Sequence, residues 1–159
     1  MVNVFLLLGS NLGNRELQLK QAITNIEKQI GTITKSSSVY QTAAWGKTDV
    51  PSYLNQVIQL ETTLPASILL DKILNIELEL GRVREEKWGS RIIDIDILFY
   101  GDMIINKQNL QIPHPELHNR RFTMEPLAEI APDWIHPVFN KSILTIKNEI
   151  VDSLEVKKI

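Results

Sequence analysis

A β-strand pattern runs through residues 91–100, which read Arg91-Ile92-Ile93-Asp94-Ile95-Asp96-Ile97-Leu98-Phe99-Tyr100. Successive side chains of a strand point to opposite faces of its sheet. One face of this strand is then entirely apolar, with Ile93, Ile95, Ile97 and Phe99. Asp94 and Asp96 fall together on the other face, about 6.6 Å apart along the strand. The pattern predicts a strand over 92–100 that presents two neighbouring carboxylates.

Two like charges this close repel each other and lose hydration when they are partly buried, so a bound cation would stabilise the pair. Carboxylate oxygens suit Mg²⁺, which keeps several waters and bridges to substrate phosphates. The competing interpretation is a half-exposed edge strand with two solvated aspartates, since strands commonly alternate apolar and polar residues. The strand taken alone leaves both interpretations open.

Arginines gather around this strand in the sequence. Five of the six lie between positions 82 and 121: Arg82, Arg84, Arg91, Arg120 and Arg121. Guanidinium groups bind phosphate oxygens in a bidentate manner, so clustered arginines beside a metal pair indicate a polyphosphate ligand. Alternatively, these arginines form ordinary surface ion pairs with Glu85, Glu86 and Glu116.

Aromatic residues suggest a second half of the same site. Tyr53 and Asn55 begin a predicted strand and share one face, and Phe122 directly follows the Arg120-Arg121 pair. Two rings can hold a flat heterocycle between them while an amide group forms hydrogen bonds with its edge. The alternative is that these rings belong to the core. Backbone amides of residues 9–11 could also line a site at the end of the first strand, although the dinucleotide-binding fingerprint is absent.

The rest of the chain predicts alternating strands and helices. Val2–Leu8 is a short apolar run, typical of a buried strand that is central to its sheet. Further strands are expected over 32–42 and 53–62, with a hairpin from 103–105 back onto the strand at 92–100. The expected helices are one capped by Asn14 or Asn11 and closed by Gly31, one over 65–81, and short proline-limited pieces near 115–130 and 142–151.

This order of elements predicts an α+β fold. Strand, helix, strand, strand, helix, strand is typical of a split βαβ, ferredoxin-like αβ sandwich, with a mainly antiparallel sheet flanked by helices on one face. The 159 residues fit one domain, 1–159. A second domain would have no room.

Charge and composition limit the partners. Seventeen basic and 19 acidic residues give a net charge of -2, so no global positive field exists to gather nucleic acid or an anionic membrane. The apolar runs are far shorter than the roughly 18 residues that span a bilayer, and no signal-peptide pattern is visible. Cysteine is absent, which suits a reducing compartment. We expect a soluble, cytoplasmic domain.

The chain resembles the 6-hydroxymethyl-7,8-dihydropterin pyrophosphokinase family over nearly its whole length. The resemblance rests on Leu8-Gly9-Ser10-Asn11, Tyr53-Leu54-Asn55, Glu77 with Gly81-Arg82-Val83-Arg84, the run 87–98, Pro113-His114-Pro115 and Asn119-Arg120. It implies a monomeric ferredoxin-like enzyme of folate biosynthesis. Such an enzyme moves pyrophosphate from ATP to the pterin hydroxymethyl group and releases AMP.

The resemblance also implies roles for individual residues. Asp94 and Asp96 would hold two Mg²⁺ ions, and with Arg82 and Arg91 they form the expected catalytic set. The expected nucleotide contacts are Glu77, Arg84, Trp88, Arg91, His114 and Arg120, of which Arg82, Arg84 and Trp88 belong to a loop that closes over ATP in the family. The expected pterin contacts are Thr42, Tyr53, Asn55 and Phe122. The chain departs from the family pattern at Ala44, Trp45 and Ser90.

Two other functions compete on the residues alone. A metal-dependent glycosyltransferase would also use an Asp-x-Asp pair, but this chain is too short for the usual nucleotide-sugar domain. A noncatalytic ferredoxin-like module that binds a ligand or RNA could share the predicted sheet. RNA-binding modules present aromatic rings on the open face, whereas the strand at 92–100 offers two acids that repel phosphate unless a metal is bound.

Overall fold

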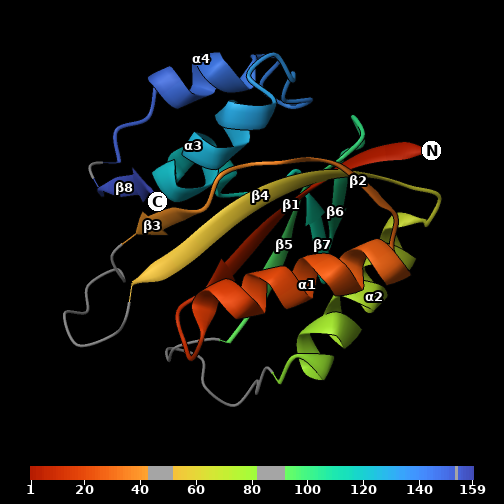
Figure 1. Ribbon diagram of the computed structural model, residues 1–159. Helices are drawn as coiled ribbons and strands as arrows, with labels where there is room; N and C mark the ends of the chain where they lie inside the picture. Colours follow the sequence, from red (N-terminus) through yellow and green to blue (C-terminus); the bar gives the residue numbers. More distant parts are fainter. Residues whose placement is uncertain (43–51, 82–91, 153) are drawn as a thin grey trace.

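The computed structural model describes residues 1–42, 52–81, 92–152 and 154–159. Within these residues the chain forms an α+β fold built on one antiparallel sheet, shown in Figure 1. The strands of this sheet are β1 (Val2–Ser10), β2 (Thr32–Ser36), β3 (Tyr40–Thr42), β4 (Tyr53–Thr62), β5 (Asp94–Tyr100) and β8 (Val156–Lys158). A separate small sheet contains β6 (Ile105–Lys107) and β7 (Leu110–Ile112).

The first strand is central, as its continuous apolar sequence predicts. β1 pairs antiparallel with β4 on one side and with β5 on the other. The sheet order is β5-β1-β4-β3-β8, and β2 pairs with a further part of β4. Among the described residues β5 pairs with β1 alone, so the strand that carries Asp94 and Asp96 lies at one edge of the sheet.

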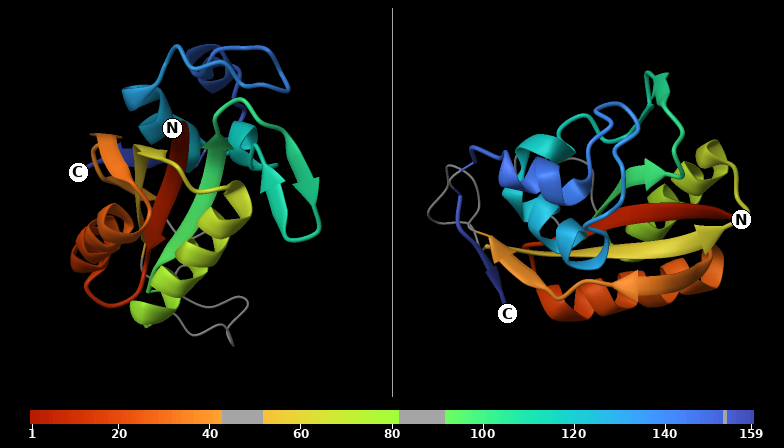
Figure 2. Two further views of the ribbon diagram at one scale, coloured as in Figure 1. Left: turned by 90° about the vertical axis from the view of Figure 1, so that its right-hand side faces the viewer. Right: turned by 90° about the horizontal axis from the view of Figure 1, so that it is seen from above.

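Helices cover both faces of the sheet, which differs from the one-sided arrangement expected from sequence (Figures 1 and 2). On one face lie α1 (Arg15–Gln29) and α2 (Ala66–Glu79), and on the other lie α3 (Arg121–Ile130) and α4 (Ile143–Asn148), after the 3-10 turn η1 (Leu117–Asn119). Leu6 of β1 packs in the core under α1 and α2, whereas Phe5 packs with Leu127 of α3. A strand covered on both faces needs apolar side chains at every position, which explains the run in β1.

The ends of α1 show one correct and one incorrect prediction. Asn14 caps the helix, since its Oδ1 accepts a hydrogen bond of 3.1 Å from the backbone N–H of Leu17. The helix ends at Ile30, and Gly31 does not act as a left-handed cap. Gly31 is needed instead because a Cβ there would lie 2.1 Å from the Glu61 carbonyl oxygen of β4. Close packing of the helix end on the sheet therefore requires this glycine.

The face predicted for Phe99 is wrong because β5 contains a bulge. Phe5 of β1 pairs with Phe99, but the next residue, Leu6, pairs with Ile97, so Leu98 is an extra residue. A bulge reverses the alternation of side chains beyond it. Phe99 accordingly packs on the α3 side, whereas Ile97 lies in the core on the α1 and α2 side. Asp94 and Asp96 precede the bulge and keep the common face that the sequence predicts.

Other strand predictions also need correction. Residues 103–105 do not return onto β5, because β6 pairs with β7 instead. The strand expected over 32–42 is divided into β2 and β3, because residues 37–39 belong to neither strand, although the Ser37 backbone N–H still donates to the Val57 carbonyl of β4. The Ser38 backbone N–H turns to the Glu129 carboxylate of α3, at 3.0 Å from Oε2. No helix in the described part of the chain is long and apolar enough to cross a membrane.

Candidate active site

A cavity of about 1080 Å³ opens on the α3 side of the sheet. Its floor is made by the ends of β1, β4 and β5, and its walls by β3, the start of α3 and the C-terminal segment. Seven of the residues predicted from sequence line it: Thr42, Tyr53, Asn55, Asp94, Asp96, Arg120 and Phe122. The fold thus brings together the acidic, the basic and the aromatic candidates, which come from β3, β4, β5 and the start of α3.

Strand register explains why the acids and the amide share the floor. Gly9 of β1 pairs with Asn55 of β4 on one side and with Asp94 of β5 on the other. A Cβ at Gly9 would lie 2.9 Å from Asn55 Oδ1, closer than real Cβ contacts allow. The glycine therefore leaves room for the Asn55 amide and keeps the floor flat between the amide and the carboxylates.

The two aspartates are half-buried on the cavity face of β5, while Ile95 between them is buried on the opposite side. Carboxylates on one face of a strand supply the hard oxygen ligands that Mg²⁺ prefers. No group of three or more potential metal-binding side chains occurs among the described residues. Two carboxylates suffice for Mg²⁺ when water and substrate phosphates complete its coordination, so the residues present fit this ion.

Glu77 lies in α2 and does not line the cavity. Its side chain is buried, and its Oε2 accepts a hydrogen bond of 2.8 Å from the backbone N–H of Ile95. This N–H belongs to the residue between the two aspartates. Glu77 therefore fixes the backbone of the Asp-x-Asp segment from the α2 side, and its expected role near the nucleotide stays a prediction.

Thr42 on the β3 wall and Asn55 on the floor present buried polar groups to the cavity. Both are buried, with 3% and 4% of their surface exposed, and both line the cavity. Thr42 Oγ1 has no hydrogen-bond partner among the described residues. Burying an unpaired hydroxyl costs free energy, so a ligand that bonds to it would gain affinity. These two polar groups are suited to form hydrogen bonds with the polar edge of a flat ligand.

Arg120 and Phe122 form the opposite wall at the start of α3. The Arg120 guanidinium carbon lies 5.5 Å from the centre of the Phe122 ring, a cation–π arrangement. Arg120 precedes the helix and Phe122 lies in its first turn, so both side chains reach the cavity from one short segment. A guanidinium group and an aromatic surface are thereby held next to each other.

His114 lies beside this wall and is not among the cavity-lining residues. Its backbone N–H donates to the Leu98 carbonyl of β5 at 3.1 Å, and its Nδ1 accepts from the Glu116 N–H at 3.1 Å. Burial, followed by the positive charge of Arg120, lowers the pKa of His114 below its usual value. The neutral ring therefore carries its hydrogen on Nε2, the nitrogen that remains to donate to an anionic ligand.

Several cavity residues were not predicted from sequence. They come from η1, from the loop before α4 and from the C-terminal segment, and include His118, Phe139, Asp152 and Leu154. The rings of His118 and Phe139 meet edge to face with centres 4.7 Å apart. No short-range pattern marks these residues, because each reaches the cavity only through tertiary packing. The candidates Arg82, Arg84, Trp88 and Arg91, and the departures Ala44, Trp45 and Ser90, lie outside the described residues.

Taken together, the fold and the cavity define an α+β protein with a pocket that combines paired carboxylates, a guanidinium group and aromatic rings. The chain belongs to the 7,8-dihydro-6-hydroxymethylpterin-pyrophosphokinase (HPPK) family, whose model matches residues 5–132. It is 43% identical to the 2-amino-4-hydroxy-6-hydroxymethyldihydropteridine pyrophosphokinase of Aquifex aeolicus, covering 94% of this chain and 92% of that protein. It is 42% identical to the Haemophilus influenzae protein of the same name, covering 91% of this chain and 90% of that one.

Solved structures share the fold. The crystal structure of wild-type HPPK-DHPS from Plasmodium falciparum superposes with a TM-score of 0.75 at 20% sequence identity. The match covers 94% of this chain and 43% of that one, so this chain spans under half of the longer protein.

Proposed function

We propose that this chain transfers pyrophosphate from ATP to 6-hydroxymethyl-7,8-dihydropterin, releasing AMP, in folate biosynthesis. The observation that carries the proposal is the cavity in which two aspartates and an arginine lie next to a buried Thr–Asn edge and an aromatic wall. Membership of the HPPK family supports it. In this proposal residues 1–159 form a single pyrophosphokinase domain, and the order β5-β1-β4-β3 corresponds to a ferredoxin-like sheet.

The acceptor half of the site binds the pterin. Tyr53 and Phe122 hold the flat ring between them, because aromatic faces stack favourably on a heterocycle. Thr42 Oγ1 and the Asn55 amide bond to the polar edge of the ring, which satisfies groups that burial would otherwise leave without water. This arrangement orients the hydroxymethyl group toward the aspartates on the neighbouring strand.

The phosphate half of the site binds ATP. Arg120 contacts phosphate oxygens and His114 donates from Nε2, while Arg82, Arg84, Arg91 and Trp88 are proposed to complete the nucleotide site. Asp94 and Asp96 are proposed to hold two Mg²⁺ ions, which when bound would neutralise phosphate charge and orient the phosphates. Glu77 supports this half by holding the Ile95 backbone.

The reaction requires positioning and charge stabilisation more than covalent work by the protein. The pterin hydroxyl oxygen attacks the β phosphorus in line with the bond to the α phosphate. That bond breaks, AMP leaves with the bridging oxygen, and the hydroxyl proton is released. No described side chain stands out as an obligatory base, so the residues act mainly by binding, orienting and excluding water. We further propose a monomer that works in the cytoplasm without a nucleic-acid partner.

The proposal is tested by incubating the protein with ATP, Mg²⁺ and 6-hydroxymethyl-7,8-dihydropterin and separating the nucleotides. We expect AMP that depends on the pterin, without ADP. Asp96→Asn keeps the shape of the side chain but removes its charge, and it should lower turnover by at least about 100-fold. Asp102→Asn is the matched control, because Asp102 is exposed in the turn after the same strand. Near-wild-type turnover of the Asp96 variant would refute the metal assignment.

A further inference from the structure

The start of α3 has an unusual cap. An α-helix begins with backbone N–H groups that have no partner within the helix, and a side chain just before the helix usually accepts from one of them. The residue in that position is Arg120, and its side chain makes no capping hydrogen bond. Instead, the N–H of Arg121 donates to Asp152 Oδ2 at 3.2 Å. The cap therefore comes from 31 residues further along the chain.

The same C-terminal segment contacts α3 at further points. Asp152 Oδ1 accepts from the Leu154 N–H at 3.0 Å, which fixes the carboxylate in place. The Arg121 guanidinium donates to the Leu154 carbonyl at 3.4 Å and also pairs with Glu125 of its own helix. Asp152 and Leu154 both line the cavity. The Arg121 backbone, the Arg121 side chain and the cavity wall are thus connected through Asp152 and Leu154.

Arg121, whose N–H donates to Asp152, lies between two residues proposed to contact the ligands. Arg120 and Phe122 flank Arg121, and their side chains reach the cavity while the Arg121 N–H is held by Asp152. Beyond Asp152 the chain forms β8, which pairs with β3 so that Val156 lies opposite Thr42. The C-terminal segment therefore touches both the aromatic wall and the Thr42 wall of the cavity.

We propose that Asp152 is a positioning residue for this site: it holds the first turn of α3 so that Phe122 and Arg120 are preorganised for pterin and phosphate. This inference rests on the proposed function for the identity of the ligands. A carboxylate near a helix N-terminus also interacts favourably with the helix dipole, which strengthens the hold. Preorganisation of this kind lowers the cost of binding without any contact between Asp152 and the reacting atoms.

The test compares three variants with the wild type. Asp152→Ala removes the cap, and the KM for the pterin should rise by up to about fivefold, the ratio reached if binding has to restore the whole stability of a typical cap, with kcat close to wild type. Asp152→Asn keeps an accepting oxygen and should restore most of the affinity, since asparagine caps helices well. Glu155→Ala removes a charge from the same segment at an exposed side chain and should change nothing. Thermal unfolding checks that each variant is folded at the assay temperature.

Hydrogen exchange separates this inference from the proposed function. Peptides covering residues 121–123 should exchange faster in Asp152→Ala than in the wild type, whatever reaction the protein catalyses. An unchanged pterin KM with unchanged exchange would overturn the positioning role, as would an equal rise in KM for Glu155→Ala. If Asp152→Ala does not fold, Asp152→Glu takes its place with the same expectation, because it displaces the carboxylate by one methylene. A wild-type protein without pterin-dependent AMP formation would refute the function and leave the exchange test standing.

Discussion

His136 should make the stability of this protein fall in mild acid. Its ring is 3% exposed, and its Nδ1 accepts hydrogen bonds from the backbone N–H groups of Val138 and Phe139 at 3.1 and 3.3 Å. The ring also stacks on Phe139 with centres 4.3 Å apart. A proton on Nδ1 would remove both accepted bonds. Burial, and next the nearby His118, lower the pKa of His136 to about 4.

The size and sign of the effect follow from this pKa. In the unfolded chain the ring titrates with a pKa of about 6.5, so the unfolded state binds a proton first as the pH falls. The neutral ring thus contributes stability that is fully present above pH 6.5 and is lost progressively toward pH 4. Between pH 7.5 and pH 4.5 this one group should lower the free energy of unfolding by roughly 2 to 3 kcal/mol.

Urea unfolding followed by circular dichroism at these two pH values measures the loss. The comparison is with His136→Asn, whose Oδ1 can accept the same backbone N–H groups without titrating. The variant should be less stable at pH 7.5, because the smaller side chain leaves a cavity beside Phe139. Between the two pH values its free energy of unfolding should, however, change by roughly 2 to 3 kcal/mol less than that of the wild type, while all other groups titrate equally in both proteins. Equal pH dependence, or a His136 midpoint near 6.5 by NMR, would refute the reasoning.

Three further predictions concern named contacts. Glu77→Leu should lower the free energy of unfolding in urea by about 2 kcal/mol because it leaves the Ile95 N–H buried without an acceptor, and Glu77→Gln should cost less than half as much. Phe122→Ala should raise the pterin KM about tenfold while titration calorimetry finds ATP affinity within about twofold of wild type. Glu129→Gln should destabilise the fold by about 1 kcal/mol in urea unfolding, because Glu129 accepts a hydrogen bond of 2.6 Å from the Tyr40 hydroxyl. A loss below about 0.3 kcal/mol for Glu77→Leu or for Glu129→Gln would contradict these assignments.

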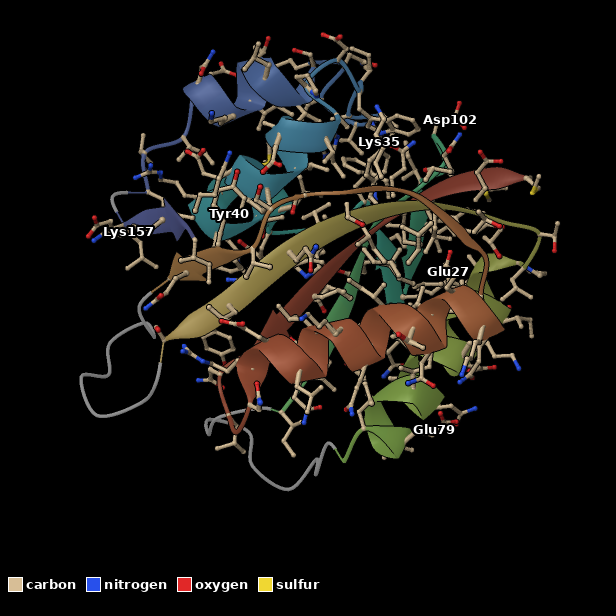
Figure 3. All side chains as sticks on the ribbon, in the orientation of Figure 1. Glu27, Lys35, Tyr40, Glu79, Asp102 and Lys157 are labelled. Carbon is tan, nitrogen blue, oxygen red and sulfur yellow. The ribbon has the colours of Figure 1, made fainter. Side chains whose placement is uncertain are left out.

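The Glu129 contact lies between β3 and α3, where Tyr40 is labelled in Figure 3. The Ser38 backbone and hydroxyl also donate to this carboxylate. Burial opposes its charge, but these hydrogen bonds from Tyr40 and Ser38 hold the pKa of Glu129 below its usual value. Burial and the bond to Glu129 raise the pKa of Tyr40. The stability contributed by Glu129 is therefore present at neutral pH and is lost as the pH falls through its lowered pKa.

Local patterns predicted those parts of the fold that depend on neighbours in sequence. The strand at 53–62 has the predicted bounds, and Asn14 caps the first helix as expected. Patterns failed where tertiary packing decides the outcome. The bulge at Leu98 depends on pairing with β1, and the division of β2 from β3 accompanies the contact of Ser38 with Glu129 of α3. The polar strand β8 has no apolar alternation to reveal it, since only its pairing with β3 defines it.

In the candidate site too, local sequence predicted some placements and tertiary packing decided the others. Asp94 and Asp96 can be placed on one face from alternation alone, because the period of a strand is fixed. The meeting of Asn55 with Asp94 depends instead on how β4 and β5 are aligned on either side of Gly9. Asp152 carries no sequence signal for its capping role, because its partner Arg121 is remote in the chain. Sequence therefore supplies candidates for chemistry, and register and packing decide which of them meet.

The close fit of Gly9 against Asn55 also bears on how the site could change under selection. Any larger residue at position 9 pushes on Asn55 Oδ1, the side chain proposed to read the pterin edge. An inhibitor that lies flat on this floor therefore meets a surface that cannot be reshaped at position 9 without disturbing the acceptor site. Escape from such a compound would have to arise elsewhere in the cavity lining, for example at the start of α3, which is not part of the sheet.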